Sequence, residues 1–322
     1  MAQGSVTLYD YHPQLASFQD QVIRGLQSNP KEIPCKFFYD SRGLALFHQI
    51  CQLPEYYPTR TEISILQQYG QEISQLLGSN CALIEYGSGS SQKIRLLLGC
   101  LTNPVAYMPI DISREDLFAD AQEMSQDYPR LDIIAICADY TKPLTLPKLD
   151  NNTIAKRVDF FPGSTIGNLN YDEALKLLGN TVAMLQPGDG LLIGTDLKKD
   201  PQILHAAYND AQGITAQFNL NLLTRINREL GGNFVLANFV HSARYNAEEG
   251  GIEMYLISQL DQTVVIGDTQ IAFAAQEAIR TENSHKYSIT EFQSLAQAAG
   301  FQPVQVWTDP AELFSVHYLS IT

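Results

Sequence analysis

A glycine-containing turn, EYGSGSS at residues 85–91, is the part of the sequence best suited to approach a ligand closely. It follows an apolar run and precedes an amphipathic segment, which indicates a strand-to-helix turn. Glycines let the backbone of such a turn come close to a ligand, and the N–H groups that open a helix favour polar or anionic groups. A G-x-G pair alone equally fits an ordinary turn. A dinucleotide fingerprint would have another glycine at position 92, and Gln92 stands there, which disfavours NAD.

Two carboxylates follow at the ends of the next apolar runs. Asp111 stands 24 residues after Gly87, and Asp139 ends the run after that. A carboxylate in the first position can accept hydrogen bonds from both ribose hydroxyls of a nucleoside. A carboxylate in the second could accept from an adenine amino group. Either residue alone could be a turn or cap residue, but together with Glu85 they predict a nucleoside site.

Short apolar runs that alternate with amphipathic segments must position these residues. The runs are nearly continuous in apolar residues, as in a parallel sheet covered on both faces, and they comprise residues 82–86, 106–112, 132–139, 157–161 and 191–197. The last intervening helix is expected to begin with Asn170 and Glu173 as a capping pair. Strands alternating with helices predict an α/β, doubly wound sheet, and such sheets bind ligands at the carboxyl ends of their strands.

The alternation stops after residue 197. A helical stretch over 203–230 ends at Gly231 and Gly232, and strand-like runs then predict an antiparallel meander. A helix over 288–299 opens with a capping-box pattern at Ser288 and Glu291. Two final apolar runs predict a closing hairpin, which is typical of S-adenosyl-L-methionine (SAM)-dependent methyltransferases, so SAM is the favoured nucleoside.

The fold expected from these patterns is that of a class I SAM-dependent methyltransferase, a Rossmann-like doubly wound sheet with a terminal antiparallel hairpin. We assign residues 61–196 and 287–322 to this SAM-binding domain. Residues 1–60 and 197–286 are expected to form a second, discontinuous α+β domain, with helices at 13–28 and 43–51 in its first part.

Composition excludes several classes of protein. Asp and Glu number 35 against 21 Lys and Arg, which makes the formal net charge −14 and disfavours nucleic acid and anionic membrane surfaces as partners. No apolar run reaches the ~20 residues of a membrane helix. The first residues lack the basic start and apolar core of a secretory signal. Neither the five cysteines nor the six histidines show metal-ligand spacing, so we expect no metal and a cytoplasmic protein with reduced thiols.

Six strings in the sequence carry a resemblance to one family. LPEYYPTRTE, EYGSGSSQK, GSTIGNL, GTDLKKD, IEM and TENS closely resemble the L-histidine Nα-methyltransferases, which form hercynine in ergothioneine biosynthesis. The resemblance covers most of the chain, from about residue 37 to 310. It implies SAM as methyl donor, with S-adenosyl-L-homocysteine (SAH) as product, and L-histidine and its mono- and dimethyl forms as substrates. The second domain would then bind the substrate, and we expect a monomer.

The same resemblance implies roles for individual residues. The cofactor-binding residues would be Gly87, Lys93, Asp111, Asp139 and Tyr140. The substrate-binding residues would be Tyr56, Gly163, Asn168, Tyr208, Met254, Glu282 and Ser284, and the catalytic ones Tyr39, Tyr56 and Asn168. Two positions depart from the family pattern, because Tyr86 stands where an aliphatic residue is commoner and Tyr140 where we would expect Phe.

These residue types suit the binding of a free amino acid. Glu282 and Ser284 stand two apart on an extended segment and therefore point to one face, where they could bond both ring nitrogens of an imidazole. Asn168 could bond the amine and the carboxylate. Tyr56 and Tyr208 could donate their hydroxyls to the carboxylate and flank the ammonium.

Other functions remain open from the residues alone. A SAM-dependent N-methyltransferase could act on another small amino acid or amine, although an apolar ring would leave Glu282 unpaired. An NAD-dependent oxidoreductase could use the same sheet edge. A non-catalytic SAM-binding regulator would share the cofactor site.

Overall fold

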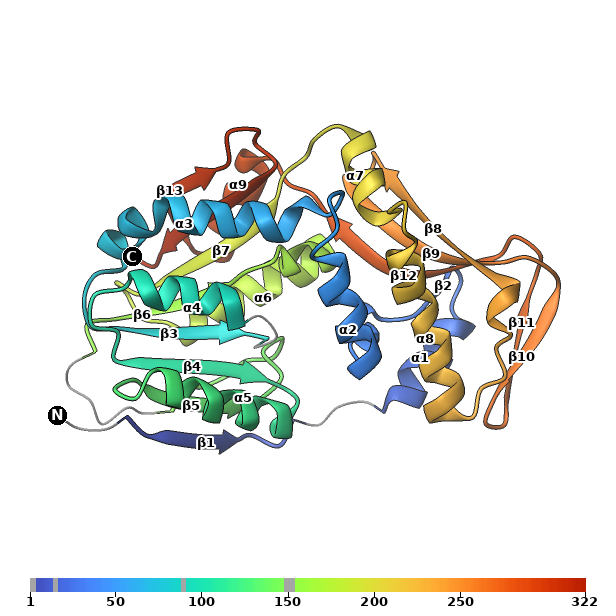
Figure 1. Ribbon diagram of the computed structural model, residues 1–322, viewed down its shortest axis with the longest axis horizontal. Helices are drawn as coiled ribbons and strands as arrows, with labels where there is room; N and C mark the ends of the chain where they lie inside the picture. Colours follow the sequence, from blue (N-terminus) through green and yellow to red (C-terminus); the bar gives the residue numbers. More distant parts are fainter. Residues whose placement is uncertain (1–3, 14–16, 88–90, 148–153) are drawn as a thin grey trace.

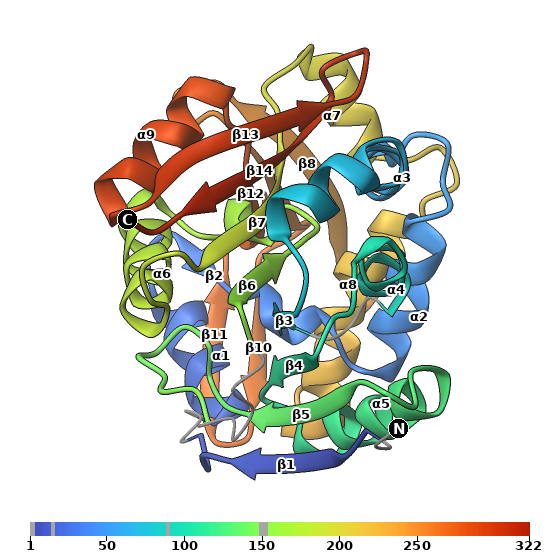
Figure 2. The ribbon, with the colours of Figure 1, turned by 90° about the vertical axis from the view of Figure 1, so that its left-hand side faces the viewer.

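The centre of the molecule is a sheet of eight strands. In the computed structural model, which describes residues 4–13, 17–87, 91–147 and 154–322, the strand order is β1-β5-β4-β3-β6-β7-β14-β13. Figure 2 shows this order from β1 at one edge to β13 at the other. The strands are β1 (Val6–Asp10), β3 (Cys81–Tyr86), β4 (Ala106–Asp111), β5 (Asp132–Cys137), β6 (Lys156–Phe161), β7 (Gly190–Asp196), β13 (Gln302–Thr308) and β14 (Phe314–Ser320).

Strand pairing confirms the expected doubly wound sheet with its closing hairpin. Strands β1, β5, β4, β3, β6 and β7 pair in parallel, whereas β14 pairs antiparallel with both β7 and β13. Every residue of β3 and of β7 is buried. This is the burial expected of parallel strands that are covered by helices on both faces.

Helices cover the two faces of the sheet, as Figure 2 shows. On one face lie α3 (Tyr57–Leu77), α4 (Ser91–Cys100) and α5 (Arg114–Asp127), and on the other α6 (Tyr171–Met184) and α9 (Ile289–Ala299). Because side chains alternate along a strand, β3 supplies both cores: Leu83 packs with the first group and Ala82 and Ile84 with the second. The capping boxes expected at Asn170 and Ser288 open α6 and α9.

A second region, at the right of Figure 1, has its own core around a smaller sheet. Its order is β2-β12-β9-β8, with β8, β9 and β12 antiparallel, as the meander predicted. The strands are β2 (Lys31–Glu32), β8 (Phe239–Asn246), β9 (Gly251–Ser258) and β12 (Ala278–His285), beside a hairpin of β10 (Gln262–Ile266) and β11 (Thr269–Phe273). The helices are α1 (Phe18–Gln27), α2 (Ser41–Ile50), α7 (Pro201–Tyr208) and α8 (Ile214–Leu230), with short 3-10 turns η1 (Cys35–Phe38) and η3 (Leu236–Asn238).

The single helical stretch expected over 203–230 is wrong, because it is broken between α7 and α8. Gly213 has a φ of 68°, a left-handed conformation that interrupts a helix. Asp210 then accepts hydrogen bonds from the backbone N–H groups of Ile214 and Thr215, at 2.9 and 2.8 Å. A carboxylate on these first amide groups starts a new helix. Gly231 ends α8 as expected, with a φ of 64°.

The N-terminal strand differs from the expected division of the chain. The sequence patterns place residues 1–60 in the second domain, yet β1 forms the edge of the large sheet, where Val6–Asp10 pairs with Ile133–Cys137 of β5. The strand joins the sheet because β5 would otherwise present an open edge of unpaired backbone groups. The other boundaries of the two domains stay a prediction.

The two regions meet where β12 leaves the small sheet. The short 3-10 turn η2 (Thr165–Asn168) follows β6 and packs against β12. Gly167 makes this contact possible, since a Cβ there would lie 2.6 Å from the backbone oxygen of His285. Figure 1 shows the carboxyl ends of β3 and β4 facing the second region. This junction lies beside the sheet edge where the sequence places the site.

Candidate active site

Three of the predicted cofactor residues lie at the carboxyl ends of neighbouring strands of the large sheet. Gly87 directly follows β3 with a φ of 71°, and a Cβ there would meet nothing within 4 Å. Asp111 ends β4 and accepts a hydrogen bond from the N–H of Ser113 at 2.9 Å. Asp139 follows β5 and accepts from the N–H and hydroxyl of Thr141. Because these strands are parallel neighbours, the structure brings the three together as predicted. The intervening residues 88–90 of the glycine turn lie outside the described part.

Tyr140 lies on an aromatic cluster next to this edge. Its ring stacks on Tyr86, with centroids 5.1 Å apart and an interplanar angle of 13°, and both rings meet Phe161 edge-on. The Tyr86 hydroxyl donates to the buried carboxyl of Asp159 at 2.7 Å. Tyr86 stands where the family pattern has an aliphatic residue, and its hydroxyl has a buried hydrogen-bond partner in Asp159. Burial raises the pKa of Asp159 to about 8.

Glu85, which contributed to the nucleoside prediction, bonds another side chain of the sheet. Its side chain is fully buried, and the hydroxyl of Tyr107 donates to it. Burial raises its pKa to about 8, against the opposing effect of the Tyr107 hydrogen bond. This raised pKa favours the neutral form of the buried carboxyl group near pH 7.

Lys93 is held inside the protein by Glu62 of α3. Its ammonium lies 2.5 Å from Glu62 Oε2, and both carboxylate oxygens accept from the N–H of Gly163, at 3.0 and 2.9 Å. Gly194 leaves the room for this carboxylate, since a Cβ there would come within 2.1 Å of Glu62 Oε1. Glu62 therefore ties a predicted cofactor residue to a predicted substrate residue. It stands in the LPEYYPTRTE string, but sequence reasoning assigned it no role.

The predicted tyrosines come together on an aromatic wall. Tyr39 meets Phe47 edge-on at 5.6 Å, Phe47 meets Tyr56 at 6.2 Å, and Tyr56 meets Tyr208 at 6.3 Å. Tyr39 is 41 % exposed, so it can reach a ligand from solvent. Burial raises the pKa of Tyr56 well above its usual value, which keeps this phenol a hydrogen-bond donor. Phe47, which no motif had singled out, links the predicted residues.

Asn168, Met254, Glu282 and Ser284 surround the junction between η2 and β12. Asn168 is half-buried at the end of η2. Glu282 and Ser284 share one face of β12, and burial raises the pKa of Glu282 to about 7, against the opposing charge of Lys286. Met254 stands opposite Glu282 on β9, but it is only 1 % exposed within the core of the second region. Of the four, Met254 is therefore the least accessible to a ligand.

A buried network behind Ser284 was missed by sequence reasoning. Lys286, which is 1 % exposed, pairs with Asp196 at 2.7 Å, and Lys199 and the hydroxyl of Tyr57 bind the same carboxylate. Burial would raise the pKa of Asp196, but the two lysines outweigh it and hold that pKa below its usual value. Burial lowers the pKa of Lys199 to about 8, against the attraction of Asp196.

Two sequence signals could have revealed this network. Lys286 continues the alternation of Glu282 and Ser284, which places all three on one face of an extended segment. Asp196 and Lys199 lie in the GTDLKKD string, which carried part of the family resemblance.

Tyr208 makes a contact that differs from its expected use. Its hydroxyl donates to Ser284 Oγ at 3.0 Å and accepts from Lys286 at 3.0 Å. A hydroxyl has one proton to donate, so donation to a substrate carboxylate would require the bond to Ser284 to break. The structure thus brings Tyr208 to the predicted place but directs its proton toward Ser284.

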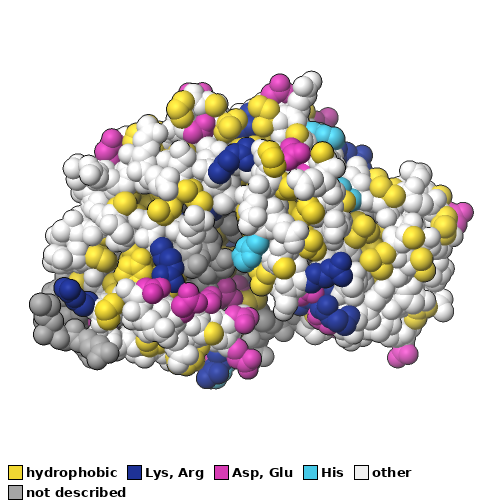
Figure 3. Space-filling model, in the orientation of Figure 1, with side chains coloured by type: hydrophobic (Ala, Val, Ile, Leu, Met, Phe, Trp, Pro, Cys, Tyr) yellow, Lys and Arg dark blue, Asp and Glu magenta, His cyan; other side chains and the backbone are white. Residues whose placement is uncertain are grey.

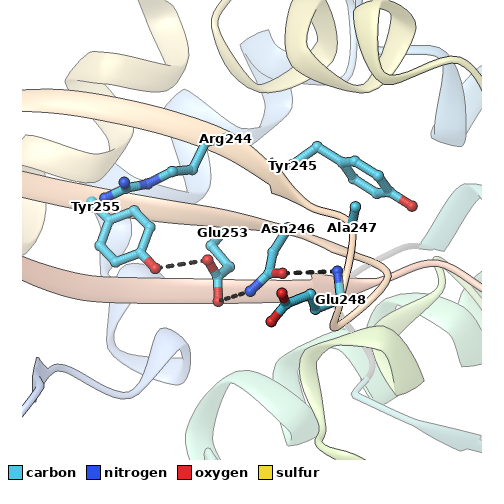
Figure 4. A pocket seen from close by; sticks show the side chains of 7 residues that line it. All are labelled: Arg244, Tyr245, Asn246, Ala247, Glu248, Glu253 and Tyr255. Atoms are coloured by element: carbon cyan, nitrogen blue, oxygen red, sulfur yellow. Dashed lines mark hydrogen bonds between the residues drawn. The ribbon is translucent and has the colours of Figure 1, made fainter.

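A shallow pocket on the hairpin of β8 and β9 lies on the other face of the small sheet (Figure 4). Glu253 lines it and stands opposite Asn283, whose neighbours Glu282 and Ser284 point the other way. Several of its polar groups contact one another: Tyr255 donates to Glu253 at 2.7 Å, and the Arg244 guanidinium lies over the Tyr255 ring. We therefore regard this pocket as separate from the candidate active site.

The acidic surplus lies partly on the surface of the large-sheet region. Figure 3 shows Asp and Glu side chains gathered over α5, which carries Glu115, Asp116, Asp120, Glu123 and Asp127. On this face the Lys and Arg side chains are scattered. Within the described residues there is no cluster of His, Cys, Asp and Glu able to hold a metal ion. In that same part of the chain, no helix has the length and apolar character needed to span a membrane.

Comparison with known proteins gives a family match and several similar sequences. A family model described as "Histidine-specific methyltransferase, SAM-dependent" matches residues 18–321. A histidine N-alpha-methyltransferase of Mycolicibacterium smegmatis is 40% identical over 300 residues, which cover 92% of each chain. Ergothioneine biosynthesis protein 1 of Neurospora crassa is 32% identical over 91% of this chain and 34% of its own. Among solved structures, a putative methyltransferase of Thermobifida fusca has a TM-score of 0.48 at 13% identity, covering 94% of each chain.

Proposed function

Because the chain belongs to the family of SAM-dependent, histidine-specific methyltransferases, we propose that it transfers methyl groups from SAM to the α-amino nitrogen of L-histidine. The product of full methylation is hercynine, the trimethylated amino acid of ergothioneine biosynthesis. The observation that carries this proposal is the 40% identity to a histidine N-alpha-methyltransferase over nearly the whole of both chains. The arrangement at the junction of η2 and β12 is compatible with it.

The residues at the sheet edge fit a SAM molecule. Open space next to Gly87, where a Cβ would meet nothing within 4 Å, lets a ligand approach the backbone. Asp111 and Asp139 can accept from ribose hydroxyls and an adenine amino group, and Tyr140 offers an aromatic surface. We propose these residues, with Gly87 and Lys93, as the cofactor site. SAM supplies a methyl group bound to a positively charged sulfur.

The reaction requires a neutral amine held in line with that methyl group. The nitrogen lone pair forms the new N–C bond while the C–S bond breaks, and its electron pair returns to sulfur to form SAH. The amine must first lose a proton, and it must lie ~3–3.5 Å from the methyl carbon. Asn168 at the end of η2, with Tyr39 and Tyr56 on the aromatic wall, is proposed to orient the amine and carboxylate.

The ring of the substrate is proposed to bind at β12. Glu282 can accept from the ring N–H, and Ser284 can bond the other ring nitrogen, because both side chains leave the same face of the strand. Tyr208 on the aromatic wall, Gly163, bonded to Glu62 through its N–H, and Met254, opposite Glu282, complete the proposed substrate set. We further propose that residues 61–196 and 287–322 bind SAM and that the second region binds histidine. In the cell the protein is proposed to be a cytoplasmic monomer whose partners are small molecules.

Mass spectrometry of L-histidine after incubation with SAM tests the function. We expect products that carry one, two and three added methyl groups, with SAH formed in step. SAM bound without any modified histidine would favour a regulator instead. Methylation of another amino acid in preference to histidine would keep the chemistry and change the substrate. Quenching or enhancement of NADH fluorescence on titration would favour the oxidoreductase alternative.

A further inference from the structure

Lys286 donates to three groups at the wall of the proposed ring site. Its Nζ lies 2.7 Å from Asp196 Oδ2, 2.8 Å from Ser284 Oγ and 3.0 Å from the hydroxyl oxygen of Tyr208. A lysine ammonium has three protons and no lone pair, so it can act only as a donor. All three protons are accounted for by these partners. The side chain is 1 % exposed, which means that water does not compete for them.

Because Lys286 is only a donor, neither the Tyr208 nor the Ser284 hydroxyl can donate to it. The Tyr208 hydroxyl oxygen accepts a hydrogen bond from Lys286, and its own O–H donates to Ser284 Oγ at 3.0 Å. Ser284 Oγ therefore accepts from both Lys286 and Tyr208, which occupies its two lone pairs. Its own proton is left to be donated, on the side of β12 that carries Glu282.

We propose that Lys286 is a positioning residue that makes Ser284 a hydrogen-bond donor toward the substrate ring. The inference rests on the proposed function and deepens it. Glu282 would accept a hydrogen bond from the ring N–H, and Ser284 would donate one to the unprotonated ring nitrogen. The site would therefore recognise a neutral imidazole, which has one donor and one acceptor nitrogen. A ring with an N–H but no acceptor nitrogen would leave the Ser284 proton unpaired, which is costly in a buried site.

Asp196, the last residue of β7, anchors Lys286. The carboxylate also binds Lys199 and the hydroxyl of Tyr57, and its backbone N–H donates to Ser164 Oγ at 2.9 Å. Removal of the Lys286 ammonium therefore leaves Asp196 with a cationic partner. For this reason we expect the Lys286→Met variant to fold.

The test compares two ligands on the SAH-loaded protein by calorimetry. One is L-histidine, and the other is its analogue with a pyrrole ring, which keeps the N–H but has C–H in place of the acceptor nitrogen. The wild type is expected to prefer histidine strongly. In Lys286→Met this preference should fall by about 5-fold or more, because Ser284 is no longer forced to donate. If Lys286→Met does not fold, Lys286→Leu, which also lacks a donor, is measured with the same criterion.

Two controls separate positioning from general support of the fold. Lys199→Met removes the other lysine that binds Asp196. Since Lys199 bonds Tyr57 and not Ser284, this variant should leave the preference for histidine over the pyrrole analogue unchanged. In a Ser284→Ala background, Lys286→Met should have no further effect on the preference, because the hydroxyl through which it acts is gone.

Three results would overturn the inference. An equal loss of affinity for both ligands in Lys286→Met would show a merely structural role. An unchanged preference, or the same decrease in the Ser284→Ala background, would show that Lys286 does not act through Ser284. Failure of the proposed function is distinguishable, since the wild type itself would then not bind histidine.

Discussion

Buried carboxyl groups behave in opposite ways in two parts of this molecule. Inside the large sheet, Glu85 and Asp159 accept hydrogen bonds from Tyr107 and Tyr86, and burial raises the pKa of each to about 8. At the junction, Asp196 also accepts from a tyrosine, but its pKa lies below the usual value. The difference is the pair of lysines, Lys199 and Lys286, that binds Asp196.

This contrast shows that burial and a hydrogen bond from a tyrosine do not by themselves decide whether a carboxyl group is ionised. Without a cation, the buried acid keeps its proton and acts as a neutral part of the core. With two cations, it stays ionised and can hold donors in fixed directions. The sheet uses the first arrangement for stability, whereas the junction places the second directly behind the proposed ring site.

The largest expected effect concerns the charged carboxylate. Asp196→Asn leaves two buried lysines without their counter-charge, so we expect it to lower the free energy of unfolding by about 3–5 kcal/mol. Asp159→Asn, the matched change at a neutral acid, should cost about 1 kcal/mol or less at pH 7. Urea denaturation of both variants measures the difference. Similar losses in the two variants would remove the contrast between the regions.

Glu282→Gln should weaken histidine binding by about 10- to 100-fold, because an amide oxygen accepts a hydrogen bond from the ring N–H less strongly than a carboxylate does. SAH binding should be unchanged, since the cofactor residues lie on the other sheet. Glu253→Gln is the matched control, because Glu253 lies on the opposite face of the small sheet. Calorimetry with each ligand is the measurement. A parallel loss of SAH affinity would mean that Glu282 does not belong to the substrate site.

Gly167→Ala tests how closely the two regions must approach. The new Cβ would lie 2.6 Å from the backbone oxygen of His285, so we expect a loss of about 1–3 kcal/mol in stability. The KM for histidine should rise as β12 is displaced. Gly179→Ala on α6 is the control, because a Cβ there meets nothing within 4 Å and alanine favours a helix. Thermal unfolding measures the loss of stability, and steady-state kinetics measures the KM. If Gly167→Ala behaves like the control, the close approach of Gly167 to His285 is not required.

The neutral acids predict a pH dependence of stability. A carboxyl group whose pKa rises on folding, from 4.5 or 3.8 to about 8, stabilises the folded state fully below about pH 4. That contribution is lost as the pH rises toward and past about 8, by on the order of 1 kcal/mol per pH unit for each group. Asp159→Asn and Glu85→Gln should therefore flatten the decline between pH 5 and 8. Denaturation curves across this range check the slope, and parallel curves for wild type and variants would contradict the assignment.

Local patterns predicted much of the large sheet. The apolar runs at 82–86 and 191–197, the capping boxes at Asn170 and Ser288, and the closing hairpin are all present. The single helix predicted across 203–230 was wrong, because Gly213 interrupts it and Asp210 caps a new helix. In the sequence, these two residues do not stand out from the helical pattern around them. The edge position of β1 was missed because its partner β5 lies more than a hundred residues along the chain.

The sequence by itself determined the alternation of strands and helices and placed Gly87, Asp111 and Asp139 at the carboxyl ends of strands. It also placed Glu282 and Ser284 on one face of a strand. These features follow from the periodicity of neighbouring residues. Only the tertiary structure decided which groups carry charge and where protons point. Lys286 meets Asp196, and Tyr208 meets Ser284, across long stretches of chain. Such contacts depend on how β7, α7 and β12 pack against one another, and burial then sets the protonation of each group.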